Sequence, residues 1–160
     1  IDWVTTGSQD TSDGIYRSVN FKMDNWGVEA DLNIYPKELW GSKIPVKRFA
    51  VKYAYIDENP RYNVQVLQSK YALEYLRHKV VLHADLQLWR RLSLGVSWRY
   101  QHRTGTGNAP YDILDARLSW DARHWSVHLD ATNLLNRKYY DFIYIPGPGI
   151  VVMAGVKITI

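Results

Sequence analysis

Hydrophobic and polar residues alternate almost without a break from Leu114 to Leu135, and the alternation pauses only at a tight turn. Strict alternation predicts β-strands with two different faces. One face of this segment is almost purely apolar, whereas the other carries Asp, Arg, Ser, His and Thr. A soluble sheet tolerates this pattern. A transmembrane β-barrel requires it, because its strands face lipid on one side and a polar lumen on the other.

The same pattern extends over the whole chain and predicts eight strands, separated by segments rich in Gly, Pro, Asp and Asn. The predicted strands cover residues 1–6, 16–35, 47–56, 71–89, 92–102, 111–121, 124–132 and 150–160. Two of them, 16–35 and 71–89, exceed the ~9–11 residues that cross a bilayer. These two strands are therefore expected to project beyond the membrane.

The predicted connections differ in length. Arg90-Arg91 and Ala122-Arg123 are two-residue turns, whereas the other connections are loops, at 7–14, 57–69, 103–110 and 135–149. Outer-membrane barrels combine short periplasmic turns with longer extracellular loops. If the C-terminus is periplasmic, all four loops lie outside. The connection 36–45 is the exception, since it is long where a short turn is expected.

Composition narrows the class of protein. The chain has no cysteine, which excludes a disulfide scaffold, a thiolate metal site and a cysteine nucleophile. It also has no run of ~18 apolar residues, so no transmembrane helix is expected. The 7 Trp and 12 Tyr against 3 Phe favour a membrane–water interface. Lys and Arg are dispersed and the net charge is only +4, so no nucleic-acid partner is expected.

Four ordered pieces of sequence carry a resemblance to a known family. Residues 130–141, DATNLLNRKYYD, resemble a "NLFNKKYYD" signature with Leu135 where Phe is usual. Residues 146–150 resemble a "PxPG" lead into the last strand, 26–30 resemble an "xGVE" step, and 1–4 resemble an "IDW/IDY" strand. In this order they are similar to the C-terminal part of a TonB-dependent outer-membrane receptor. The residues of the signature are Asn133, Leu134, Asn136, Tyr139 and Tyr140. Outer-membrane barrels commonly end in an aromatic residue, whereas this chain ends at Ile160.

The resemblance implies an all-β, antiparallel up-and-down transmembrane β-barrel segment, about eight strands of a 22-strand barrel closed by a plug domain. Residues 1–160 are then expected to be a C-terminal fragment without the plug, the TonB box and the earlier strands. The parent would import a ferric siderophore, haem, cobalamin or a similar nutrient across the bacterial outer membrane. Its implied partners are the remainder of the same receptor, the lipid bilayer, the TonB complex acting through the plug, and a small nutrient ligand; no cofactor is implied.

Ligand-binding candidates are cationic and aromatic residues at the predicted outer loops: Arg61, Tyr62, His102, Arg103, Tyr111 and Tyr144. Tyr139 and Tyr140 are expected to belong to the interfacial aromatic belt instead. No catalytic residue is proposed, because nothing resembles a nucleophile elbow, a phosphate loop or a catalytic dyad. The chain is therefore not expected to be an enzyme.

Charged residues of the last strands are expected to line the lumen. His124 and His128 share a face but lie ~13 Å apart along a strand, too far to share a metal ion. Three aspartates, Asp115, Asp121 and Asp130, have arginines nearby, and ion-pair ladders are the expected arrangement. These arginines are Arg117, Arg123 and Arg137.

Two other interpretations stay open from the sequence. One is a complete small eight-stranded outer-membrane barrel with a structural or adhesive role, since eight strands can close around side chains. The other is a soluble β-sandwich or ligand-binding barrel. A parent protein several-fold larger than 18.7 kDa would favour the receptor, and solubility without detergent would favour the soluble fold.

Overall fold

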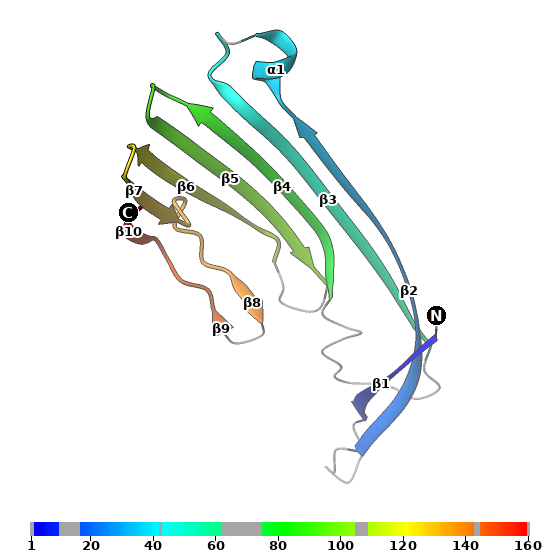
Figure 1. Ribbon diagram of the computed structural model, residues 1–160. Coiled ribbons are helices and arrows are strands. Elements are labelled where there is room, and N and C mark those ends of the chain that lie inside the picture. The colour runs from blue at the N-terminus through cyan, green and yellow to red at the C-terminus, as the bar shows by residue number, and fades with distance from the viewer. Residues whose placement is uncertain are drawn as a thin grey trace. The chain divides into compact units, whose positions relative to one another are not determined.

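The computed structural model describes residues 2–9, 17–41, 43–61, 75–104, 109–142 and 145–159. These residues form mostly strands, shown in Figure 1. The elements are β1 (Asp2–Gln9), β2 (Arg17–Ile34), α1 (Pro36–Trp40), β3 (Val46–Arg61), β4 (Leu76–Gln87), β5 (Leu92–Arg103), β6 (Tyr111–Asp121), β7 (Trp125–Thr132), β8 (Tyr140–Phe142), β9 (Ile145–Pro146) and β10 (Val151–Ile158). Within these ranges, no helix has the length and hydrophobicity needed to cross a membrane.

Eight strands form one sheet in the order β1-β2-β3-β4-β5-β6-β7-β10, and β8 and β9 form a separate pair. Neighbours in the large sheet are consecutive in the chain, apart from the small β8–β9 hairpin between β7 and β10. The pairs β1–β2, β6–β7 and β7–β10 are antiparallel, with Leu118 opposite Leu129 in β6–β7 and Leu129 opposite Ala154 in β7–β10. The predicted all-β, antiparallel up-and-down sheet is confirmed.

Several predicted boundaries were wrong. β3 continues to Arg61, although residues 57–61 were predicted as loop, and β1 continues to Gln9, where its partner is Arg17. The predicted loop 135–149 contains the β8–β9 hairpin. In each case strand pairing persists where the alternation of apolar and polar residues has already faded. The predicted strand start at Tyr71 lies outside the described residues, and β4 is described from Leu76.

The connection between β2 and β3 contains the short helix α1. Pro36 opens it, and a proline suits the first helical position because its missing N–H would have no partner there. The backbone N–H groups of Glu38 and Leu39 donate to the carbonyl of Tyr35. Gly41 ends the helix with φ of 104°, which favours glycine. This helix fills the connection that was predicted to be unusually long.

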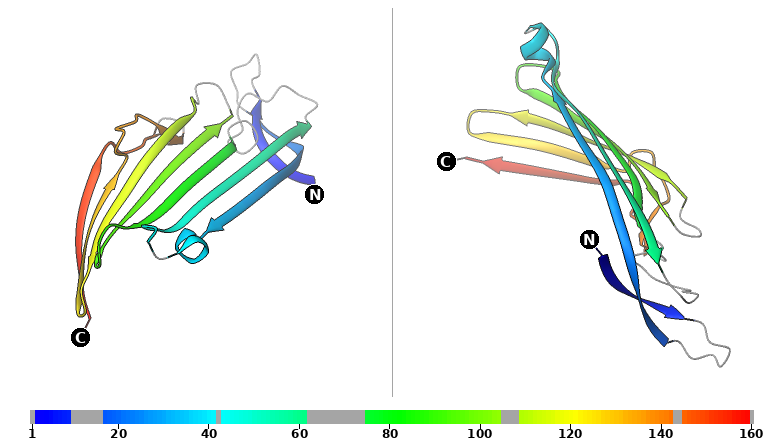
Figure 2. Two further views of the ribbon diagram at one scale, coloured as in Figure 1. Left: turned by 90° about the horizontal axis from the view of Figure 1, so that it is seen from above. Right: turned by 90° about the vertical axis from the view of Figure 1, so that its right-hand side faces the viewer.

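The chain divides into two compact units, which are described separately below. Unit 1 comprises Ile1–Glu29, Ala54–Lys79 and Gln101–Pro110; unit 2 comprises Ala30–Tyr53, Val80–Tyr100 and Tyr111–Ile160. In unit 2, the turns after β4 and β6 and the end of β10 lie along the same edge of the sheet as α1, as both views in Figure 2 show. The opposite edge of unit 2 carries the β8–β9 hairpin.

The apolar face of unit 2 is exposed. Its large apolar side chains with more than a third of their surface accessible include Leu32, Tyr53, Leu118, Trp120, Trp125, Val127, Leu129, Val152, Val156 and Ile158. By contrast, the buried apolar residues of the described chain are only Ala50, Tyr111, Ile113 and Tyr139. A soluble domain rarely exposes so continuous an apolar surface. The sheet therefore has the two different faces that a membrane strand needs.

Candidate functional site

The polar face of unit 2 encloses a hollow of 960 Å³. Side chains from α1, from β3 to β7 and from β10 line it. Its charged lining residues are Lys37, Glu38, Lys47, Arg48, His83, Asp85, Asp115, Arg117 and Asp130. Ser93, Gly95 and Ser97 of β5 contribute small groups between them. The predicted polar lumen face is thus a real surface with mixed charge.

An Arg–Asp–His group lies on one side of the hollow. Arg48 Nε of β3 donates to Asp85 Oδ2 of β4 at 2.9 Å, and His83 Nε2 lies 3.0 Å from Asp85 Oδ1. Gly95 of β5 leaves space beside this carboxylate, since a Cβ there would lie 3.5 Å from Asp85 Oδ1. The two partners satisfy both oxygens of one lumen-facing carboxylate.

A second group of the same composition comes from β6 and β7. Arg117 contacts Asp130 in a bidentate manner, with Nη2 2.9 Å from Oδ2, and His128 Nε2 lies 3.7 Å from the same oxygen. The His128 ring packs against Gly155 of β10, so a larger residue at that position would displace the ring. Of the ion-pair ladders expected among these aspartates and arginines, the Asp130–Arg117 pair is present. Arg137 pairs with Asp112 instead, at 3.0 Å.

The carboxylates of both groups are engaged in ion pairs. Among the residues that the structure describes, no three His, Asp or Glu side chains converge as metal ligands. Both carboxylates are held by arginines and serve as acceptors. Ion pairs of this kind suit a wet channel wall, where opposite charges on neighbouring strands stabilise each other.

The signature residues near the C-terminus form a compact hydrogen-bonded cluster around Asn133, which we call the knot. Asn133 is only 2% exposed and has a left-handed backbone, with φ of 52°. Its Nδ2 donates to the carbonyls of Arg137 and Pro148 at 2.9 and 3.0 Å, and its Oδ1 accepts from the N–H of Arg137 at 2.8 Å. Its own N–H donates to Asp115 Oδ1 at 2.9 Å. The side chain and the backbone N–H of this one residue thus join β6, the β7–β8 turn and the lead into β10.

Tyr139 adds an aromatic contact to the knot. Its ring packs on Tyr111 with ring centroids 4.8 Å apart, and both rings are 9% exposed. The expectation that Tyr139 belongs to the interfacial belt was wrong, because the ring is buried against Tyr111 and Gly147. Tyr140 points outward and is 53% exposed. Leu134 and Asn136 shape the turn: the N–H of Leu134 donates to Leu114, and Asn136 has φ of 49°.

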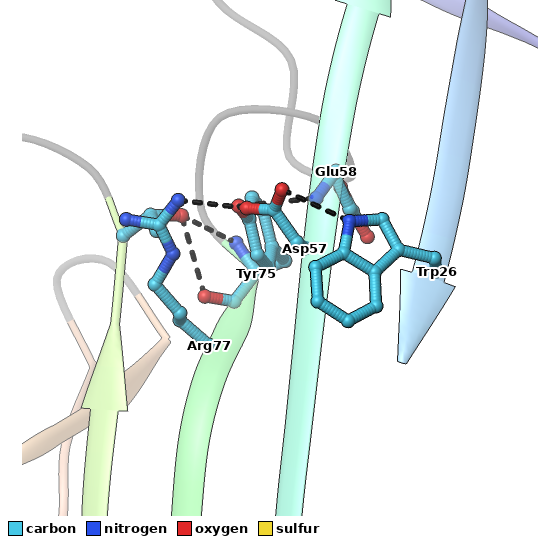
Figure 3. Close-up of polar contacts among 6 residues, drawn as sticks. Trp26, Asp57, Glu58, Tyr75 and Arg77 are labelled. Atoms are coloured by element: carbon cyan, nitrogen blue, oxygen red, sulfur yellow. Dashed lines mark hydrogen bonds and ion pairs between the residues drawn. The ribbon is translucent and has the colours of Figure 1, made fainter. Parts of the chain in front are cut away.

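A different polar cluster lies in unit 1, where β2, β3 and β4 approach the predicted outer loops. Asp57 stands at its centre, as Figure 3 shows. Its carboxylate accepts from Trp26 Nε1 at 3.2 Å, from the Tyr75 hydroxyl at 3.3 Å and from Arg77 Nη2 at 2.8 Å. The Tyr75 hydroxyl also accepts from the N–H of Glu58, and Tyr75 and Thr104 are hydrogen bonded. We call these six residues the loop-end cluster.

The pKa values of the two acidic groups of the loop-end cluster are shifted in opposite directions. Asp57 is the twelfth residue of β3, past the ~9–11 residues that cross a bilayer. The hydrogen bond from Arg77 lowers the pKa of Asp57 against the opposing effect of burial. Burial, followed by repulsion from Asp57, raises the pKa of Glu58 to about 7. Glu58 Oε2 is buried and has no hydrogen-bond partner among the described residues, as expected for a carboxyl that favours its neutral form.

A row of aromatic rings crosses the same unit. Trp26 packs edge-on against Tyr55 at 5.2 Å, Tyr55 lies 4.9 Å from His78, and His78 stacks on His102 at 5.9 Å. The ligand candidate His102 stands at the end of this row and contacts His78, an arrangement that no sequence pattern predicted. The neighbouring Arg103 has a buried Nε–H group for which no described atom serves as a hydrogen-bond acceptor.

The remaining ligand candidates fall in different places. Arg61 ends β3, and its side chain is outside the described atoms, as are Tyr62 and Tyr144 altogether. Tyr111 lies in the knot, where its hydroxyl contacts Asp141. Sequence reasoning missed Asp57, Tyr75 and Arg77, because 57–69 was predicted as a loop and no periodic signal links those three positions.

Comparison with known proteins agrees with this geometry. The family model described as "TonB dependent receptor-like, beta-barrel" matches residues 1–134. The chain belongs to this family. Neither a search of the curated proteins nor one of the solved structures found a match.

Membership of the TonB-dependent receptor family confirms the resemblance inferred from the sequence. The matched segment ends at Leu134, so it includes the first part of the signature and stops before Asn136 and the β8–β9 hairpin. The family comprises TonB-coupled transporters of the outer membrane rather than enzymes, in keeping with a polar wall of paired charges.

Proposed function

We propose that this chain supplies barrel wall and extracellular loops to a TonB-coupled outer-membrane importer of a small nutrient. The observation that carries the proposal is the two-faced sheet of unit 2. One face exposes a continuous apolar surface, and the other lines a hollow with two Arg–Asp–His groups. Lipid outside and water inside is the one setting that stabilises both faces together.

The strand lengths support an orientation. β6 and β7 have 11 and 8 residues, close to the length that spans a bilayer, whereas β2 and β3 have 18 and 16. The extra length of β3 lies at its loop end, because its first residue, Val46, directly follows the α1 connection. We place the turns after β4 and β6 in the periplasm and the loop-end cluster outside the cell.

The pairing of the strands supports a place in a larger barrel. In the order of the described strands, β1 and β10 each have one neighbouring strand. An unpaired edge inside a membrane is costly, because its N–H and C=O groups find no water there. Further strands of the same receptor would satisfy both edges, and a plug would fill the lumen as in 22-strand barrels. TonB would then act through that plug.

The proposed ligand contacts lie at the outer end. Arg61, Tyr62, His102, Arg103 and Tyr144 are the candidates, and Tyr111 would shape the site from within the knot. The unpartnered Nε of Arg103 and the ring of His102 offer a cation and an aromatic surface. A ferric siderophore, haem, cobalamin or a similar nutrient is the proposed cargo class.

The test is nutrient uptake by cells that express the full-length parent. Uptake of labelled siderophore, haem or cobalamin should require both the parent gene and TonB. Arg103→Ala should weaken binding of the transported nutrient to whole cells, and Lys138→Ala, a matched removal of an exposed cation, should leave binding unchanged. TonB-independent uptake, or no uptake of any candidate, would overturn the importer.

The size of the parent tests the placement in a larger barrel. An antibody to residues 135–149 should detect a protein several-fold larger than 18.7 kDa in the outer membrane. A band near 18.7 kDa would instead support the small eight-stranded barrel with a structural or adhesive role.

A further inference from the structure

The turn edge of unit 2 concentrates exposed tryptophans. Trp40 is the last residue of α1, Trp89 lies in the β4–β5 turn, and Trp120 and Trp125 flank the β6–β7 turn. They are 68%, 67%, 38% and 46% exposed. Backbone hydrogen bonds join these turns into one line: Gln87 to Pro45, Asp121 to Arg91, and Thr159 to His124. The helix and turns that carry the four tryptophans therefore lie along one edge of the sheet (Figure 2).

Cations alternate with these tryptophans along the same edge. Arg90 and Arg91 follow Trp89, Arg123 lies between Trp120 and Trp125, and Lys43 and Lys157 stand at its two ends. All five are exposed, and none of them forms an ion pair or side-chain hydrogen bond within the portion of the chain that is described. The carboxylates on this edge are Glu38, which faces the hollow, and Asp121. The turn edge is thus a net positive row with aromatic rings between the charges.

We infer that the turn edge binds anionic glycerophospholipid headgroups of the periplasmic leaflet. Indole rings prefer the headgroup level, where the ring is apolar and its N–H meets water. Unpaired Arg and Lys side chains at that level attract phosphate, and a guanidinium holds it with two parallel hydrogen bonds. The apolar face next to the row would contact the acyl chains of the same lipids. The inference rests on the proposed membrane-spanning barrel and its orientation.

The predicted partner is a lipid such as phosphatidylglycerol rather than free phosphate. A free anion would gain only the charged contacts, whereas the lipid also buries acyl chains against Val127, Val156 and their neighbours. Each basic residue near an anionic membrane surface strengthens binding to that surface about fivefold. Three such residues together should favour an anionic lipid over phosphatidylcholine by roughly tenfold or more, after allowance for screening.

The test is native mass spectrometry of the full-length receptor released from nanodiscs that contain equal amounts of phosphatidylglycerol and phosphatidylcholine. The wild type should retain phosphatidylglycerol preferentially. Arg90→Ser/Arg91→Ser/Arg123→Ser should lose roughly tenfold or more of that preference, since three phosphate contacts disappear. Arg90→Lys/Arg91→Lys/Arg123→Lys keeps the charge and should keep most of it. Lys138→Ser, at the opposite end of the strands, should change nothing.

Other outcomes separate the possible failures. Equal retention of both lipids by the wild type, or unchanged preference in the serine variant, would overturn the inference. Displacement of the lipid by millimolar inorganic phosphate would show an anion site without lipid selectivity and would also overturn it. In a second set of nanodiscs that also contain lipid A, preferential retention of lipid A over phosphatidylglycerol would place this edge in the outer leaflet and contradict the assigned leaflet. Failure of the protein to enter nanodiscs at all would count against the proposed membrane function itself.

Discussion

The knot around Asn133 and the loop-end cluster around Asp57 organise strand ends in opposite ways. The knot is built from a neutral amide that is almost fully buried, with each polar atom of its side chain bonded to backbone. The cluster is built from a half-buried carboxylate that accepts from three different side chains. The knot fixes one backbone path, whereas the cluster holds charges whose balance depends on pH. The first arrangement specifies structure, and the second can respond to its surroundings.

The largest effect is expected from Asn133→Ala. The change leaves two carbonyls and one N–H of the knot without partners, at ~1–3 kcal/mol for each buried group left unsatisfied, and places alanine at φ of 52°. We expect a loss of about 3 kcal/mol or more of folding free energy, measured by denaturant unfolding in lipid. Asn136→Ala is the matched control, because Asn136 has a similar φ of 49° but an exposed side chain. A control variant as unstable as Asn133→Ala would refute the role given to the amide bonds.

Gly147→Ala should be the next most disruptive change. A Cβ at this position would overlap the ring of Tyr139, which Tyr111 prevents from moving away. Overpacking of this kind costs ~1–3 kcal/mol. Gly95→Ala offers a control, since its Cβ would meet Asp85 Oδ1 at an ordinary 3.5 Å. Heat-induced gel-mobility shifts should show a lower transition temperature for Gly147→Ala alone; equal transitions would show that the knot can relax.

Asp57→Asn tests whether charge matters in the loop-end cluster. The amide keeps one of the two acceptor oxygens, which serve Trp26 and Tyr75 separately, and it loses the ion pair with Arg77. We expect a modest loss of local order, measured as faster hydrogen exchange at the Thr104 N–H, which is bonded to Tyr75. The exchange of the knot should stay unchanged. Unaltered exchange at Thr104 would mean that shape rather than charge holds the cluster.

Glu58→Gln should produce the smallest change, visible only as a function of pH. The raised pKa of Glu58 means that the folded state keeps a proton that the unfolded state loses. The contribution of Glu58 to local stability is therefore full when the pH is below its ordinary pKa of 4.5. This contribution falls as the pH rises toward about 7, and above that pH the stability no longer changes. Glu58→Gln should flatten this dependence in Thr104 exchange, corrected for the intrinsic effect of pH. Glu29→Gln, on exposed β2, should retain the wild-type dependence; a sloping profile in Glu58→Gln would contradict the assignment.

The same two regions show what the sequence could predict. The strands of unit 2 alternate because lipid and water impose opposite demands on their faces, so β6 was predicted over its full range Tyr111–Asp121. The residues of the knot were recognised from the sequence as a signature. The hydrogen bonds of the buried Asn133 could not be predicted, because they join three distant backbone segments. Beyond the membrane both faces meet water and alternation carries no information, so β3 was predicted to end five residues before Arg61.

The loop-end cluster could not be predicted from the sequence for a related reason. Trp26, Asp57 and Arg77 are far apart in the chain, and the register that unites them follows from strand pairing rather than from any local pattern. The belt assignment of Tyr139 failed because alternation cannot distinguish a ring at the interface from a ring packed inside a turn. Only Tyr140 of that pair is exposed.

The central claim is that the large sheet has a lipid face and a water face, and β7 gives its most direct test. Residues 1–160 contain no cysteine, so single cysteines can be placed at each residue from 125 to 132 and spin-labelled in bilayers. Labels at Val127→Cys and Leu129→Cys should be relaxed by oxygen, and labels at Ser126→Cys and His128→Cys by a water-soluble nickel chelate. Strict alternation between the two relaxants is the predicted result. Equal access of the nickel chelate to all eight positions would contradict the membrane barrel.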